Sequence, residues 1–202
     1  MQIGSNTVLR SDATAPITVH SIDKEGGEAT IDSTPAYPGS PVSVTRRVRW
    51  TDDTVTVEDR IILSSPEPIA IRFHTPAAEP AAIERGKSPA GGARWSYAAT
   101  VAASERVFSP RYGPEQDLPV NAHWVFPEQD ILRIPETRFD ISSDQPLRIE
   151  NRTGYNHTLK FRRARMEHTV LTLSTEEPVL ELHVTTRIAV DGSFPNDSKR
   201  LD

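Results

Sequence analysis

The 202-residue sequence predicts an all-β fold, an antiparallel β-sandwich of many strands with no substantial helix. Two observations carry this prediction. Short runs of alternating apolar and polar residues recur along the chain, and a period of two is the pattern of a strand with one buried face. Turn-forming residues, among them 17 prolines, separate these runs, and no segment sustains a helical period.

The first part of the chain contains runs of this kind at residues 6–10, 17–22, 28–32, 42–50, 54–63 and 68–75. The last three have the clearest pattern, with one apolar side each: Val42, Val44, Val48 and Trp50; then Val55 and Val57; then Ile69, Ile71 and Phe73. Because short turn-rich segments connect these three runs, we predict that they form neighbouring antiparallel strands, a three-stranded meander.

Residues 76–92 are rich in Ala, Pro and Gly and show no alternation, which predicts a long surface loop with at most one helical turn, at 80–85. Further runs follow at 93–102, 120–126, 130–134, 138–141, 147–150, 157–163, 169–173 and 179–190. We therefore divide the chain into residues 1–92, with the meander and the loop, and residues 93–202. The second part carries the remaining strands of the same sandwich or a second small sandwich.

Composition excludes several classes of protein. The formal charge of −5 argues against a nucleic-acid partner, which would require a basic surface. No apolar run approaches the roughly 18 residues that a membrane helix needs, so no membrane partner is expected. The sequence contains no cysteine, which excludes disulfides and thiolate metal sites. The first ten residues lack a secretory signal pattern and start directly at a candidate strand, as expected for a piece of a longer polypeptide.

One charge interrupts the apolar side of the meander. Arg46 falls on the same side of its run as Val44 and Val48. A guanidinium in that position needs an acidic partner, and Asp59 on the next run is the nearest candidate. We predict that Arg46 and Asp59 form a structural pair that is mostly hidden from solvent.

Several short motifs in this region occur in an order typical of one family. They are Asn6-Thr7-Val8-Leu9, Ala36-Tyr37, Arg46-Arg47-x-Arg49, Val55-x-Val57-x-Asp59-Arg60 and Phe73-His74-Thr75. In these motifs, over about the first 75 residues, the chain resembles the C-terminal β-sheet region of the heparinase II/III-like polysaccharide lyases.

The resemblance implies one part of a two-part enzyme. In such lyases an N-terminal α/α toroid of the same polypeptide carries the Tyr and His that perform β-elimination on an acidic polysaccharide, beside a uronate carboxylate. This chain has no segment that could form a helical toroid, so we assign no catalytic residue to it. If the chain follows the family, it works in the periplasm or outside the cell.

The resemblance also raises the question of zinc, which the family's β region can hold as a structural ion. Where its ligands are expected, this sequence has Ser5 and either Thr45 or Arg46, with Asp23 near the acidic position. One carboxylate does not hold an ion that takes four ligands. We therefore predict no metal site and no other cofactor.

Three residues are candidates for contact with an acidic polysaccharide. His74 and Arg72 share the polar face of their run and can donate hydrogen bonds to a sugar carboxylate or hydroxyl. Tyr37 sits between two proline-containing turns and could lean over a groove. The alternatives are a surface histidine bonded to a loop carbonyl, and a loop aromatic that covers the end of the sandwich.

Other readings of the whole chain remain open. It could be a non-catalytic carbohydrate-binding sandwich or a purely structural β-domain. The basic run at residues 160–165 could attract an acidic glycan, although such runs are usually the solvated face of a strand. Asn151-Arg152-Thr153 reads as a glycosylation sequon, which matters only in a secreted eukaryotic protein.

Overall fold

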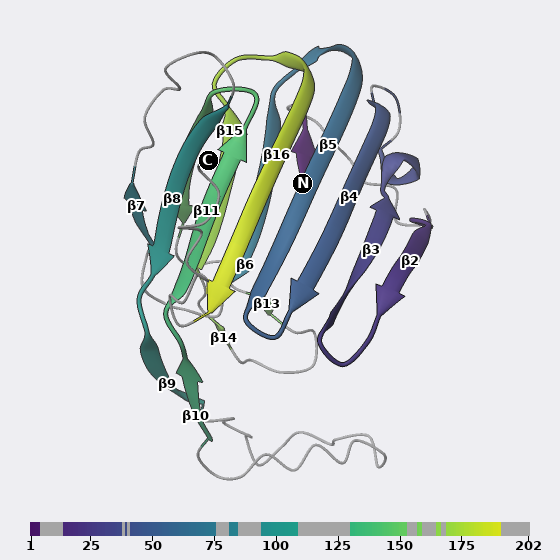
Figure 1. The fold of residues 1–202 in the computed structure, drawn as a ribbon. Helices are drawn as coiled ribbons and strands as arrows, with labels where there is room; N and C mark the ends of the chain where they lie inside the picture. The colour runs from purple at the N-terminus through teal and green to yellow at the C-terminus, as the bar shows by residue number, and fades with distance from the viewer. Residues whose placement is uncertain are drawn as a thin grey trace, which may run out of the picture.

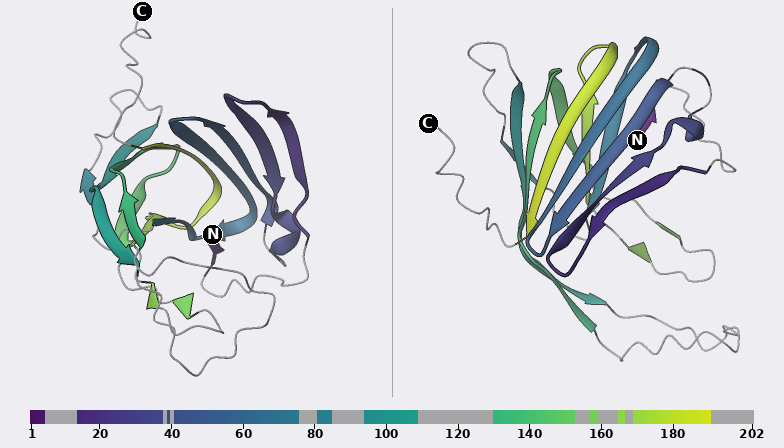
Figure 2. Two further views of the ribbon diagram at one scale, coloured as in Figure 1. Left: turned by 90° about the horizontal axis from the view of Figure 1, so that it is seen from below. Right: turned by 45° about the vertical axis from the view of Figure 1, so that its right-hand side comes forward.

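The computed structural model describes residues 1–4, 14–37, 39, 41–75, 81–84, 94–108, 130–152, 157–158, 165–166 and 169–190. Within these ranges two antiparallel sheets pack against each other, as Figure 1 and Figure 2 show. The helical structure in the same ranges is a single 3-10 turn, η1 (Thr34–Ala36). The predicted all-β sandwich is confirmed. No helix in the described part of the chain is long and apolar enough to cross a membrane.

The larger sheet has eight strands, and we call it the large sheet. In spatial order its strands are β2 (Ile17–Ile22), β3 (Gly26–Asp32), β4 (Pro41–Thr51), β5 (Thr54–Glu67), β16 (Val179–Val190), β11 (Thr137–Ser143), β8 (Trp95–Val101) and β7 (Ala82–Glu84). The bounds predicted for 17–22 and 179–190 are confirmed to the residue.

The smaller sheet has four strands, and we call it the small sheet. Its order is β1 (Gln2–Ile3), β6 (Ile69–Thr75), β15 (Thr169–Thr175) and β12 (Leu147–Arg152). Two short ribbons lie outside both sheets, β9 (Ser104–Phe108) with β10 (Asp130–Ile134) and β13 (His157–Thr158) with β14 (Arg165–Met166). The predicted runs at 6–10 and 120–126, and most of 157–163, lie outside the described residues.

The core lies between the two sheets and is aliphatic. Ile61 and Leu182 of the large sheet and Ile71 and Leu171 of the small sheet are fully buried. Each such side chain contributes roughly 1.5–3 kcal/mol relative to an exposed one. Alternation along the strands thus supplies one apolar face from each sheet, and these two faces hold the sandwich together.

The predicted meander is wrong in its third strand. β4 and β5 pair as expected, but β6 lies in the small sheet between β1 and β15. The second edge of β5 is occupied by β16, so β6 cannot pair there. Ile69 and Ile71 are buried, as the alternation predicted, and they face the large sheet from across the core. Alternation predicts which face is buried but not which strand lies next to it.

Two local predictions are also wrong. Val42 is 62% exposed, because the register shifts between Pro41 and Ser43 and the extra residue of this β-bulge turns away from the core. The segment predicted to be a long loop contains β7, which pairs with β8 over Ala82–Glu84. A three-residue strand is too short to show alternation.

Candidate functional site

The predicted pair of Arg46 and Asp59 is present, on the inner face of the large sheet. The two residues lie directly opposite each other on β4 and β5. Arg46 Nε donates to Asp59 Oδ1 at 2.7 Å and an Nη donates to Oδ2 at 2.9 Å. The Asp59 side chain is 1% exposed and that of Arg46 is 30% exposed. This bidentate pair ties two strands together internally and does not offer its charge to a ligand.

Tyr37 also belongs to the interior, so the prediction that it leans over a groove is wrong. It follows η1, its residue exposure is 9%, and it packs within the hydrophobic core. Its backbone N–H donates to Thr34 O at 3.1 Å, which closes the turn that carries its ring inward. Its hydroxyl donates to Met1 O at 3.4 Å, and burial raises the pKa of this phenol.

Arg72 and His74 come together on the outer face of the small sheet. Both are exposed, and they alternate with the inward-facing Ile71 and Phe73 on β6. Arg72 lies opposite Thr172 of β15, which in turn lies opposite Glu150 of β12. The predicted shared face of these two residues is therefore confirmed, while their role in binding stays a prediction.

A hollow of about 290 Å³ opens beside Arg72. Its lining includes Thr172 and Ser174, together with Gln2 and Glu150. An Nη of Arg72 donates to Gln2 Oε1 at 2.6 Å, and Gln2 Nε2 donates to Gly4 O at 3.2 Å. Within the described part of the chain, Arg72 has no carboxylate partner. Glu150 in contrast is held by Arg148 at 2.6 Å, so the positive charge of Arg72 faces a neutral amide.

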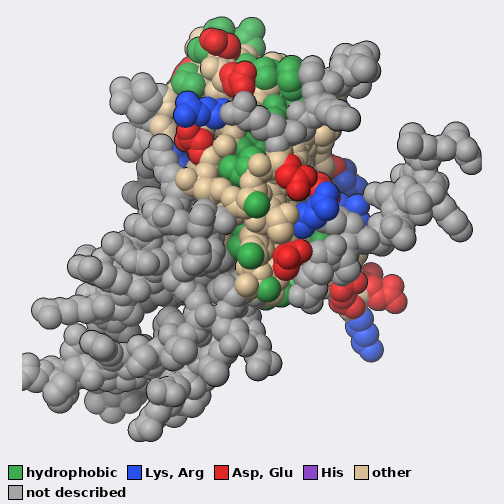
Figure 3. All heavy atoms as spheres, turned by 90° about the vertical axis from the view of Figure 1, so that its left-hand side faces the viewer, with side chains coloured by type: hydrophobic (Ala, Val, Ile, Leu, Met, Phe, Trp, Pro, Cys, Tyr) green, Lys and Arg blue, Asp and Glu red, His purple; other side chains and the backbone are tan. Residues whose placement is uncertain are grey.

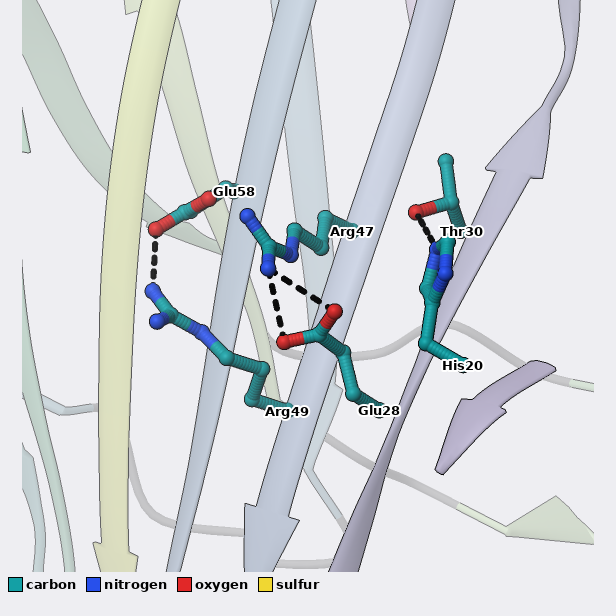
Figure 4. Close-up of polar contacts among 6 residues, drawn as sticks. All are labelled: His20, Glu28, Thr30, Arg47, Arg49 and Glu58. Atoms are coloured by element: carbon teal, nitrogen blue, oxygen red, sulfur yellow. Dashed lines mark hydrogen bonds and ion pairs between the residues drawn. The ribbon is translucent and has the colours of Figure 1, made fainter. Parts of the chain in front are cut away.

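The outer face of the large sheet has a different charge pattern. Four of its arginines pair with a carboxylate: Arg47 with Glu28, Arg49 with Glu58, Arg60 with Glu181 and Arg138 with Asp140. Figure 4 shows the first two of these pairs side by side, with His20 bonded to Thr30 at 2.8 Å beyond them. The bond from Arg47 holds the pKa of Glu28 below its usual range. The sequence motif marks β4 as a basic strand, whereas carboxylates on the neighbouring strands β3 and β5 neutralise Arg47 and Arg49.

A second hollow, of about 460 Å³, lies on this same outer face near β7, β8, β11 and β16. Its charged lining consists of Arg138, Arg187, Asp140 and Glu84. From the β7 side, Figure 3 shows acidic and basic side chains next to one another among the described atoms. Because its charges balance, this larger hollow fits an anionic ligand less well than the hollow at Arg72.

The positions considered for zinc do not fit a metal site. Asp23 Oδ1 accepts hydrogen bonds from the backbone of Glu25 at 2.8 Å and Gly26 at 3.0 Å, which closes the turn between β2 and β3. Arg46 is bound to Asp59, and a guanidinium is not a ligand. Ser5 lies outside the described residues. Among the residues that the structure describes, no group of His, Asp or Glu side chains could hold a metal ion.

The sequon at Asn151 is engaged inside the fold. Asn151 Nδ2 donates to the backbone oxygen of Ala81, and its Oδ1 atom is buried. The amide nitrogen that would carry a glycan is therefore occupied in the folded chain. The second feature left open, the basic run at 160–165, lies outside the described residues except for Arg165 in β14.

The sequence model of the family described as "Heparinase II/III-like, C-terminal" matches residues 4–179. The chain belongs to this family. This confirms the resemblance found in the motifs, and the family is one of polysaccharide lyases. The match runs from Gly4 beside β1 to the first residue of β16, so it includes the residues that line the hollow at Arg72, apart from Gln2. Comparison with curated proteins gives no match.

Proposed function

We propose that this chain is the β-sandwich portion of a polysaccharide lyase that cleaves a uronate-containing glycan by β-elimination. That reaction needs a neutralised carboxylate, a base that removes the neighbouring proton, and an acid that protonates the leaving oxygen. In this proposal an N-terminal α/α toroid supplies the base and the acid. The sandwich supplies a wall of the binding groove and a positive charge.

The environment of Arg72 is the single observation that best supports this role. A guanidinium presents a rigid fork of donors that matches both oxygens of a carboxylate. Gln2 Oε1, 2.6 Å from the Arg72 guanidinium, marks the place that one oxygen of a ligand carboxylate would take. Thr172 and Ser174 line the same hollow and offer hydroxyl groups to a sugar. His74, two residues farther along β6, adds a second donor on this face.

The charge of the hollow suggests which anions it accepts. Glu150 lies in the lining but is neutralised by Arg148, so the hollow offers the single positive charge of Arg72 among its described residues. One carboxylate per sugar matches this charge. A ligand with several closely spaced anionic groups would also place a negative charge next to the carboxylate of Glu150. We therefore propose a glycan whose charge at this subsite is a uronate carboxylate.

The second candidate is a non-catalytic carbohydrate-binding sandwich, and the same hollow supports it. The two candidates agree on binding and differ on turnover. The isolated chain lacks the toroid in either case, so we expect it to bind acidic oligosaccharides weakly and to cleave none. Unsaturated uronate absorbance after joining the chain to its helical domain would distinguish a lyase from a binding module.

The test at the level of binding is calorimetric titration of the 202-residue chain with alginate and heparan oligosaccharides. We expect binding that weakens as salt is added, because charge pairing carries it. Arg72→Gln should abolish it. Arg47→Gln, which removes a guanidinium from the neutralised outer face of the large sheet, should leave it unchanged. Equal loss in both variants would show non-specific attraction and remove Arg72 from the proposal.

A further inference from the structure

The four sheet edges in the described structure differ in how they are protected. Unpaired backbone groups on an edge strand invite another strand, and proteins usually prevent this with short or charged edges. β1 has two residues, and β7 has three residues and carries Glu84. β12 presents Arg148 and Glu150. β2, by contrast, is a six-residue strand, ITVHSI, without a charged residue or a proline.

β2 also exposes an apolar side. Ile17 is 64% exposed, Val19 58% and Ile22 73%. Ile17 and Val19 lie opposite Ile31 and Ala29 of β3, and a register shift between Val19 and Ser21 then brings Ile22, rather than Ser21, opposite Gly27. All three large apolar side chains therefore share the inner face of the sheet at its edge. In Figure 2 this edge is the outermost purple strand.

The direction of the free backbone groups can be derived from one bond. The N–H of Asp32 donates to Pro16 O at 2.9 Å, and the same register places Thr18 opposite Thr30. In an antiparallel pair, alternate residues direct their N–H and C=O groups toward the same neighbour. Pro16 and Thr18 thus face β3, while Ile17 and Val19 direct their backbone groups toward the open edge. Pro16 lacks an N–H, but it faces β3 and therefore does not interrupt the row of backbone donors and acceptors on the open edge.

We propose that β2 is a dimerisation edge, on which a second copy of this chain adds its own β2 in antiparallel orientation across a two-fold axis. The strand complements itself. With Thr18 on the axis, Ile17 of each copy lies opposite Val19 of the other, and both residues have outward backbone groups. This register pairs apolar residues on the inner face, avoids the bulge, and brings no like charges together, since β2 is uncharged. The two large sheets become one continuous sheet.

Analytical ultracentrifugation of the 202-residue chain over a wide concentration range tests the proposal. We expect a dimer that dissociates on dilution, because a six-residue edge buries a small area. Val19→Lys should raise the dissociation constant at least about tenfold, since it places a charge beside an apolar partner. Val190→Lys is the matched control: Val190 is also exposed, at 42%, but ends β16 away from the β2 edge. It should dimerise like the parent chain.

The absence of cysteine allows a test of the register. On the axis, the two Thr18 residues form a non-hydrogen-bonded pair, whose Cα atoms lie roughly 4.5 Å apart. That separation is within the range of about 4.4–6.8 Å found for disulfides. Thr18→Cys should therefore form a disulfide-linked dimer under mild oxidation, and Ser65→Cys, at an exposed position of β5, should not.

The proposal is overturned if the parent chain stays monomeric at all concentrations, or if Val19→Lys and Val190→Lys dimerise equally. If the parent chain is monomeric, a strand of another polypeptide becomes the alternative partner for the β2 edge. Equal cross-linking of the two cysteine variants would also contradict the two-fold pairing, because random collision would then explain both.

Discussion

Arg46 and Arg72 show two uses of the same side chain in neighbouring parts of the molecule. Arg46 points between the sheets, and one edge of its guanidinium is held by both carboxylate oxygens of Asp59, which is 1% exposed. Arg72 points out of the small sheet, is exposed, and bonds to the neutral amide of Gln2. A charge inside the sandwich requires a fixed partner, since the interior offers no water to replace it. A charge on the surface can be left available for a ligand.

Removing the partner of each arginine should therefore have very different effects on stability. Asp59→Ala leaves the guanidinium of Arg46 without its carboxylate and should lower the free energy of unfolding by about 3 kcal/mol. Gln2→Ala, its control, should cost under about 0.5 kcal/mol, because water can solvate the exposed Arg72. Urea denaturation of both variants measures the difference. Equal midpoints for Asp59→Ala and the parent chain would show that the internal pair contributes nothing.

On the outer face of the small sheet, a substitution is expected to change activity rather than stability. In an enzyme that contains both the toroid and this sandwich, His74→Ala should lower kcat/KM roughly tenfold or more, about 1.4 kcal/mol of transition-state binding. The thermal midpoint should stay that of the parent, because His74 is exposed. Full activity of His74→Ala would show that the residue is an ordinary surface histidine with no part in the site.

Replacing the whole internal pair sharpens the same comparison. In the double variant Arg46→Met, Asp59→Leu no charge is left alone in the interior, and apolar side chains of similar size fill the space. Such replacements are often neutral or stabilising. We expect the double variant to unfold within about 1 kcal/mol of the parent chain. A loss as large as that of Asp59→Ala would mean that the pair itself, and not the avoidance of a lone charge, stabilises the fold.

The smallest expected effect concerns alkaline pH and Tyr37. Burial raises the pKa of this phenol above the usual value of about 10. The folded state therefore keeps its proton to higher pH than the unfolded state. The stability that the protonated phenol of Tyr37 contributes is complete below pH 10. It is lost as the pH rises through the pKa of the phenol in the folded state. In urea titrations, Tyr37→Phe should lose less stability than the parent as the pH rises above about 10. An identical pH dependence would contradict the burial.

The sequence predicts the faces of strands well and their partners poorly. The bounds of β2 and β16 and the buried sides of β5 and β6 follow from alternation, which is a local property. The position of β6 depends on which strands occupy the edges of β5, and β16 lies far along the chain. Arg60 and Glu181, which bond across those strands, are 121 residues apart. No local pattern contains that information.

The same limit applies to the candidate site. Alternation places Arg72 and His74 on one polar face, and charge logic pairs Arg46 with Asp59. The burial of Tyr37 depends on how η1 turns the chain over the end of the core, and its proline-rich surroundings left open whether its ring covers the end of the sandwich or leans over a groove. The difference between Arg47 and Arg72 depends on cross-strand neighbours. Glu28 neutralises Arg47, whereas Gln2 leaves the charge of Arg72 in place.

The central position of β16 has a consequence for how the chain folds. β16 is the last strand in sequence that the structure describes, yet it lies between β5 and β11 in the middle of the large sheet. During synthesis, β2 to β5 emerge early, and one edge of β5 then lacks its neighbour until Val179–Val190 leaves the ribosome. Contacts between such distant segments make folding slow. Until β16 is synthesised, the unpaired edge of β5 can also associate with other chains. We therefore expect the yield of folded protein to fall when nascent chains are crowded.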